Sequence, residues 1–167
     1  STMKDSSLAL NLAVHRLENK KFDLDFVREI IEQAAIVYDS KKSAIVELGG
    51  GVPKNTAQQT GPLLDQILKR NDGGQDYIIQ ITDARPDTGG LSGATLQEGK
   101  SWGKIHDSHE GMVTVYADTT IAFPILALYV LSNQQSRKPK RLYKKIGELY
   151  NKLSKDYFKN PNNIKKE

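Results

Sequence analysis

The sixteen residues from Gly89 to Lys104, GGLSGATLQEGKSWGK, gather the groups best suited to chemistry. They include five glycines, the acid Glu98, the only tryptophan, Trp102, and Lys104 itself. Glycine loses more conformational freedom on folding than other residues, and it serves where the backbone takes a positive φ or approaches a ligand closely. The segment therefore predicts an active-site loop, with Lys104 as its reactive group.

An amine such as that of Lys104 attacks a carbonyl or imine only when it is unprotonated. A free lysine is almost entirely ammonium at neutral pH. Partial burial beside the indole of Trp102 would disfavour the ammonium and favour the reactive amine. The alternative is that Lys104 is one of 24 basic residues and is merely solvated, with Trp102 in the core. Spacing alone favours that alternative.

Composition limits the class of protein. The 167 residues suffice for a single domain, 1–167, with a sizeable core. The chain has no apolar run of about 18 residues, which predicts no membrane span, and it shows no signal peptide. The absence of cysteine excludes disulfides and thiolate chemistry, and it is compatible with a cytoplasmic protein.

Positive charge is concentrated in residues 137–167, although the net charge is only +4. This segment predicts a basic helix and tail. A solvated helix explains it better than a nucleic-acid surface, because no aromatic residues are interleaved in an RNA-binding motif. His15, His106 and His109 are not spaced as metal ligands on one helix face, so no metal site is predicted.

Short apolar runs predict strands over 43–48, 76–82 and 112–117. They are separated by segments with helical spacing, which favours an α/β fold with a parallel sheet and helices on its faces. The stretch 120–131 is nearly all apolar, so we expect a helix buried against the sheet. Further helices are expected over 7–18, 24–38, 56–70, around 94–102, and over 139–158 with Leu142, Ile146, Leu149, Leu153 and Tyr157 on one face.

Unusual residues follow each of the three predicted strands. They are Gly49 to Lys54 after the first, Asp83 to Thr95 after the second, and Asp118 with Thr119 after the third. In open parallel sheets, ligands bind outside the carboxyl ends of the strands. The GGGVPK turn could hold a phosphate on its backbone amides, although it matches neither the dinucleotide fingerprint nor the P-loop, and a tight structural turn explains it equally well.

Four ordered segments carry a resemblance to a known family. IVELGGGVPKN, ITDARPDTGGLSGAT, EGKSWGKI and VYADTTIAFPIL resemble the C-terminal half of the deoxyhypusine synthase family, and STMKDSSLALN resembles the segment that precedes them. The sequences of these segments are most similar to those of the bacterial deoxyhypusine synthase-like and homospermidine synthase-like branch. The resemblance covers the chain up to about Leu131.

The resemblance implies NAD-dependent aminobutyl transfer on a Rossmann-like fold, usually in a cytoplasmic homotetramer with active sites at a dimer interface. NAD takes hydride from a polyamine such as spermidine, and the enzyme lysine captures the resulting imine with loss of diaminopropane. The acceptor in the family is either a protein lysine or, in homospermidine synthases, putrescine.

Carried over by position, the resemblance makes Lys104 the imine-forming lysine. Trp102 would pack along the polyamine and Glu98 would receive one of its ammonium groups. The positions that would touch NAD are Asp5, Gly50, Asp83, Ala84, Asp118 and Thr119. The other substrate-binding positions are Asn55, Gly89, Gly90, Leu91, Ser92 and Gly93.

Three positions depart from the protein-modifying members of the family. Asn55 stands where they have histidine, and Leu91 and Leu10 stand where they have aspartates. Each lost acid removes a charge-assisted contact to a polyamine ammonium worth about 1.5 to 3 kcal/mol. We therefore expect a different amine, such as a shorter polyamine or agmatine.

The chain is about half as long as subunits of the family. The resemblance therefore implies a fragment, a proteolysed product, or one half of a split enzyme that needs an N-terminal half or partner chain, in a homo- or hetero-tetramer. We expect no catalysis by the chain alone. The alternative is a non-catalytic paralogue that regulates or completes such an enzyme.

Overall fold

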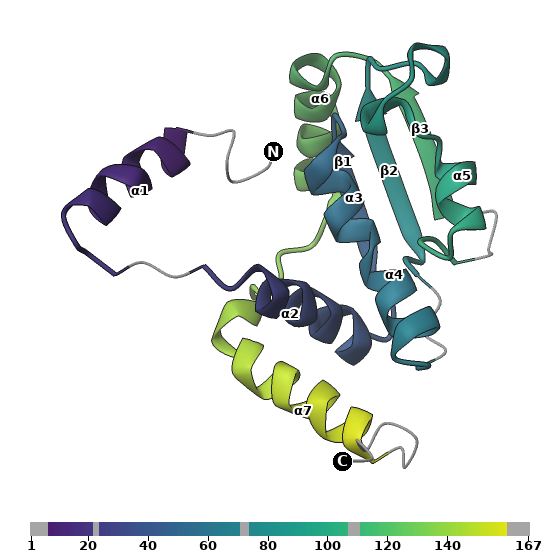
Figure 1. Cartoon of the computed structure of the whole chain (residues 1–167). Helices are drawn as coiled ribbons and strands as arrows, with labels where there is room; N and C mark the ends of the chain where they lie inside the picture. Colours follow the sequence, from purple (N-terminus) through teal and green to yellow (C-terminus); the bar gives the residue numbers. More distant parts are fainter. Residues whose placement is uncertain (1–6, 22–23, 71–73, 107–110, 160–167) are drawn as a thin grey trace.

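A three-stranded parallel sheet lies at the centre of the computed structural model, which describes residues 7–21, 24–70, 74–106 and 111–159 (Figure 1). Its strands, β1 (Ala44–Leu48), β2 (Tyr77–Thr82) and β3 (Met112–Tyr116), are adjacent in chain order. Both pairings are parallel. The carboxyl ends of the three strands therefore meet at one edge of the sheet, as the sequence predicted.

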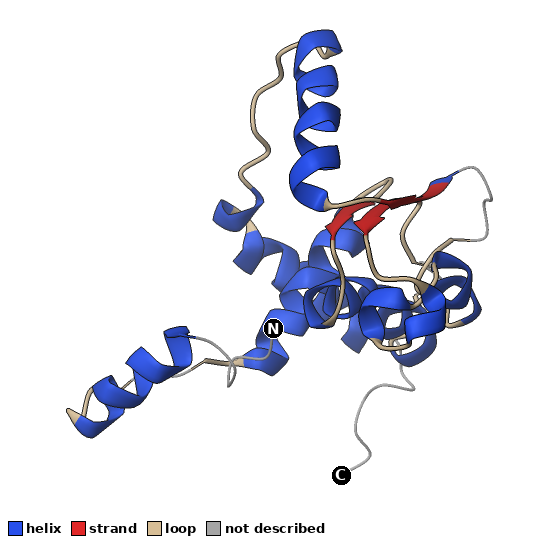
Figure 2. Ribbon diagram, turned by 90° about the horizontal axis from the view of Figure 1, so that it is seen from above, coloured by secondary structure: helices blue, strands red, loops and turns tan. Residues whose placement is uncertain are grey.

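Helices cover both faces of the sheet (Figure 2). α3 (Val52–Gln58), α4 (Thr60–Pro62) and α5 (Leu96–Ser101) lie on one face, and α6 (Thr119–Asn133) lies on the other. The architecture is α/β and Rossmann-like, which confirms the predicted fold class.

The helix expected over 56–70 begins earlier and is not continuous. α3 starts at Val52, directly after the glycine turn, and Pro53 lies in its first turn. Proline suits this place because its missing N–H has no partner there in any helix and its φ is already helical. After α4, Leu63–Ile67 form a π-helical turn.

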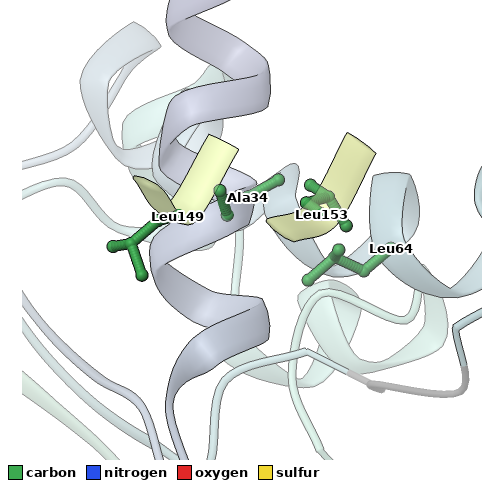
Figure 3. Packing of buried hydrophobic residues seen from close by; sticks show 5 residues of the cluster. Ala34, Leu64, Leu149 and Leu153 are labelled. Atoms are coloured by element: carbon green, nitrogen blue, oxygen red, sulfur yellow. The ribbon is translucent and has the colours of Figure 1, made fainter. Parts of the chain in front are cut away.

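A helix pair builds the first core, at the amino-terminal side of the sheet (Figure 3). α2 (Phe26–Asp39) packs against α7 (Ile146–Phe158), and Tyr38 Oη donates to Asp156 Oδ2 at 3.0 Å. Leu149 and Leu153 are buried, as the predicted amphipathic face requires. The buried residues of this core are Ala34, Ala35, Leu64, Leu149 and Leu153.

The predicted start of the basic helix at Pro139 was wrong. Arg141 has a φ of +48°, in the left-handed region, and a separate 3₁₀ turn, Leu142–Lys144, follows it. A left-handed residue cannot continue a right-handed helix, so α7 begins only at Ile146.

The expectation that the apolar helix over 120–131 would be buried was also wrong. α6 contacts β2, yet none of its residues is buried, and Ile121, Ile125, Leu128 and Leu131 are each about two-thirds exposed or more. A single helix against three strands can bury only one side of itself. Nothing in the described ranges covers the remaining sides.

Two features complete the description. A second small core of Ile78, Leu96 and Ile105 joins β2 to α5. α1 (Ser7–Leu17) stands apart from the sheet and buries no residue (Figure 1). Across the described ranges, no helix combines the length and apolar character needed to cross a membrane.

Candidate functional site

Two glycine-rich loops meet at the carboxyl edge of the sheet. A Cβ added to Gly50, in the turn after β1, would lie only 2.6 Å from Ser92 Cα, in the loop after β2. The buried Gln80 of β2 donates its Nε2 to Ser92 O at 3.2 Å and to Gly49 O at 3.5 Å. The loops are therefore packed against each other at their backbones and bridged by one side chain.

Lys54 ties the second loop to α3. Its side chain is buried, and its Nζ donates to Ala94 O at 2.7 Å and to Leu91 O at 3.4 Å. Burial lowers the pKa of Lys54 from its usual value, because the charged form loses hydration. The sequence analysis treated Lys54 only as part of the GGGVPK turn. Its position in the first turn of a helix that follows a strand could have indicated a role for it at the strand ends.

Lys104 lies at the amino-terminal end of β2, where its backbone O accepts from Gln75 N at 3.1 Å. It is half-buried, and its Nζ donates to Asn55 Oδ1 at 2.6 Å. Lys104 is therefore partly buried rather than fully solvated, while its role as the reactive group stays a prediction. Trp102 is 61% exposed, so it does not fill the core as the alternative of a solvated lysine required.

The helix α5 sets the spacing between Glu98 and Lys104. Thr95 begins it, because its Oγ1 accepts from Glu98 N at 3.1 Å and so caps the first turn. The helix ends at Ser101, and Gly103 follows with a φ of +69°, which turns the chain back. Glu98 and Trp102 are both exposed.

A buried acid lies beneath the two lysines. Glu47 of β1 is 4% exposed, and its Oε1 accepts from Gln58 Nε2 at 2.6 Å. Burial raises the pKa of Glu47, while the hydrogen bond from Gln58 and the positive charges of Lys54 and Lys104 act in the opposite direction. No feature of the apolar run AIVEL marked this acid as functional in the sequence.

Most of the predicted NAD-binding positions lie at the same edge. Asp83 is exposed directly after β2, and Ala84 N donates to Thr82 Oγ1 at 3.1 Å. Asp118 caps α6, where its Oδ1 accepts from Thr120 N at 2.7 Å and from Thr120 Oγ1 at 2.6 Å. Gly50 lies in the turn after β1 and Thr119 is the first residue of α6, whereas Asp5 lies outside the described residues.

The predicted substrate positions are not all brought together. Asn55 and the loop residues Gly89, Gly90, Leu91, Ser92 and Gly93 lie at the carboxyl edge of the sheet. Leu10 instead lies on α1, apart from the sheet, and is exposed. The loss of an acid at that position therefore has no counterpart in the geometry around Lys104.

A groove of about 990 Å³ lies away from Lys104, along β1 and α2. It is lined by residues of α2, β1, α3 and the segment before α7, among them Ile30, Val37, Ile45, Val52 and Leu142. Its apolar lining and its place on the outer side of β1 make it an extension of the sheet surface rather than part of the lysine site.

Comparison with known proteins identifies the group to which this arrangement belongs. The model of the deoxyhypusine synthase family matches residues 1–130. The chain belongs to the deoxyhypusine synthase family. The family segments with the ordered glycine loops lie at the carboxyl edge, and the SWGK lysine extends from the opposite end of β2 to Asn55 on α3.

Relatives within the family come from cyanobacteria and archaea. A deoxyhypusine synthase-like protein of Nostoc sp. strain PCC 7120 is 46% identical over 163 residues, which are 95% of this chain and 43% of the relative. One from Thermosynechococcus vestitus is 44% identical over 166 residues, covering 95% of this chain and 41% of the relative. A probable deoxyhypusine synthase 2 of Methanosarcina acetivorans is 42% identical over 125 residues, which are 75% of this chain and 36% of the relative. The chain thus spans about two-fifths of the length of these relatives.

Proposed function

We propose that the chain carries the lysine-bearing part of an aminobutyltransferase, which moves an aminobutyl group from a polyamine through an imine on Lys104. The observation that carries this proposal is the half-buried Lys104 amine, held at 2.6 Å by Asn55 of the helix that follows the first glycine turn. Family membership supports the reaction class.

Lys104 acts as the nucleophile. Its neutral amine attacks the imine carbon of the oxidised polyamine, so that a bond to Lys104 Nζ forms while the bond to the departing amine breaks. The departing amine leaves after taking a proton, and it is diaminopropane when the donor is spermidine. Asn55 Oδ1 fixes the position of Nζ before the attack, which reduces the ordering that the reaction requires.

Two exposed groups, one in α5 and one directly after it, suit an aliphatic cation. The indole of Trp102 offers a flat apolar surface to the methylene chain, and the carboxylate of Glu98 offers a partner to an ammonium group. Leu91 and Asn55 supply no further carboxylate. We infer that the amine is shorter or less charged than spermidine, and that the acceptor is either a putrescine-like amine or a protein lysine.

NAD fits the donor set at the carboxyl edge. The Asp83 carboxylate can accept from ribose hydroxyls, and a Cβ on Gly49 would meet nothing within 4 Å, so the glycine turn leaves room for a ligand at the backbone. When bound, NAD accepts a hydride from the carbon beside an amine. Gly50, Ala84, Asp118 and Thr119 complete the part of this site that the chain supplies.

The exposed apolar surface argues for additional protein around this part. Val46, Leu48 and Val113 of the strands are each about half exposed, and α6 exposes most of its apolar residues. Large exposed apolar patches mark interaction surfaces. We infer that an N-terminal half or partner chain covers them, within a homo- or hetero-tetramer, and that catalysis requires it.

Borohydride trapping tests the proposal. The chain and the protein segment that completes it are incubated with NAD and either spermidine or putrescine, reduced, and read by intact mass and peptide mapping. An aminobutyl mass on Lys104 is expected, and it is absent in Lys104→Ala but retained in Lys100→Ala. The amine that reacts identifies the donor. No adduct in the complete assembly would instead favour the non-catalytic paralogue.

A further inference from the structure

Glu47 and Lys54 are two buried charged residues with no part in the imine chemistry proposed above. Their side chains do not form an ion pair within 4.0 Å, but Gln58, which binds Glu47, lies one helical turn after Lys54 on α3. Glu47 is 4% exposed and Lys54 is 7% exposed. Glu47 Oε1 binds Gln58, but Oε2 is buried with no hydrogen-bond partner among the described residues. A buried acid with one unmatched oxygen is costly unless a nearby positive charge compensates for it.

Lys54 supplies a positive charge that must itself be compensated. Its ammonium donates to two backbone carbonyls, Leu91 O and Ala94 O, which are neutral groups. Hydrogen bonds from a charged donor are stronger than those from a neutral amine. The hold on the loop therefore depends on keeping Lys54 protonated although it is almost entirely buried.

We propose that Glu47 and Lys54 form a buried clasp: the Glu47 carboxylate keeps Lys54 charged, and charged Lys54 holds residues 91–94 in place beside Lys104. Both are positioning residues. The clasp rests on the proposed function in one respect, that the loop it holds is the substrate loop.

The charges around the clasp come from three elements. Lys54 lies on α3, Glu47 on β1, Glu98 on α5, and Lys104 follows α5. The two acids favour the charged form of Lys54, and Lys104 and burial oppose it. Glu98 is exposed and screened by water, which leaves Glu47 as the buried counter-charge.

Hydrogen exchange and lysine labelling of the full 167-residue chain test the clasp without NAD or polyamine, so the result does not depend on the proposed reaction. Lys54→Met keeps the length of the side chain and removes its charge. Loop amides in a peptide spanning 88–95 should exchange about tenfold faster in this variant, and Lys54→Arg should restore slow exchange. The peptide spanning β2 serves as the internal reference for an intact fold.

Glu47→Gln isolates the counter-charge, because the amide oxygen can still accept from Gln58. In this variant, acetic anhydride should label Lys54 about tenfold faster at pH 8, since more of the amine is neutral, while labelling of the exposed Lys140 stays unchanged. Equal Lys54 labelling in wild type and Glu47→Gln would overturn the proposal. If Glu47→Gln does not fold, unchanged loop exchange in Lys54→Met overturns it, and faster exchange that Lys54→Arg reverses supports it.

Discussion

Gly50→Ala is the change whose effect the structure specifies most closely. The new Cβ would lie 2.6 Å from Ser92 Cα, 3.0 Å from Ser92 Cβ and 3.2 Å from Ser92 O. Two of these three atoms are backbone, so no rotation of a side chain can relieve the contact. The loop after β2 must move away from the turn after β1.

The displacement can be estimated from ordinary contact distances. Van der Waals contact begins at 3.4 Å, so the backbone at Ser92 must shift by about 0.8 Å. Introducing a methyl group into such a tight contact costs about 1 to 3 kcal/mol of unfolding free energy. For a chain of this size, each kcal/mol lowers the Tm by about 2 to 4 °C. The same shift pulls Ser92 O away from Gln80 and loosens the substrate loop.

Thermal and urea unfolding measure the stability change, and borohydride trapping in the complete assembly measures the functional one. Gly147→Ala is the matched control, since Gly147 is exposed in the first turn of α7 and a Cβ there meets nothing within 4 Å. That variant should gain up to about 1 kcal/mol, because alanine favours the helix. Slower trapping on Lys104 is expected for Gly50→Ala alone.

The reasoning fails if Gly50→Ala is as stable as the wild type and traps aminobutyl groups at the same rate. That result would mean that the two loops are not in contact at Gly50 and Ser92. A loss of stability without slower trapping would retain the contact but reject its influence on Lys104.

Three further outcomes are expected. Asn55→Ala should slow trapping on Lys104 at least about tenfold without moving the Tm by more than a few degrees, because it removes the acceptor that orients Nζ; equal trapping rates would show that Asn55 does not position the amine. Leu153→Ala should lower the unfolding free energy by about 2 to 5 kcal/mol in urea titrations, since Leu153 is fully enclosed between α2 and α7. Hydrogen bonds from Thr120 lower the pKa of Asp118 below its usual value of 3.8, so their contribution is complete above that pH and is lost as the pH falls through the folded-state pKa. Asp118→Asn should therefore lose less stability than the wild type between about pH 5 and pH 2. The same loss of stability in both proteins over this pH range would contradict the capping role of Asp118.

Local patterns were sufficient for the sheet. The three strands were predicted to within one residue at each end, because runs such as YIIQIT are apolar and β-branched and are bounded by glycine or aspartate. Parallel pairing followed from the helical segments between them, and it predicted that the glycine loops and Asp118 meet at one edge of the sheet.

The boundaries of the helices and the burial of their residues could be predicted less well from the sequence. The start of α3 at Val52 depends on how a proline sits in a first turn, and the start of α7 at Ile146 depends on one left-handed residue, Arg141. The exposure of α6 could not be predicted from its own composition. Burial depends on what else packs against a helix, and no pattern within residues 119–133 carries that information.

The sequence by itself determined the α/β class, the common edge of the strand ends and the family, and it predicted Lys104 as the reactive lysine. Only the tertiary structure decided that Asn55 holds Lys104, that Gly50 meets Ser92, and that Glu47 and Lys54 are both buried. The hydrophobic periodicity and the composition of a segment describe only the helix or strand to which a residue belongs. Contacts between residues 40 or more positions apart, such as Lys54 with Ala94, arise only when separate elements are packed, so local patterns cannot specify them.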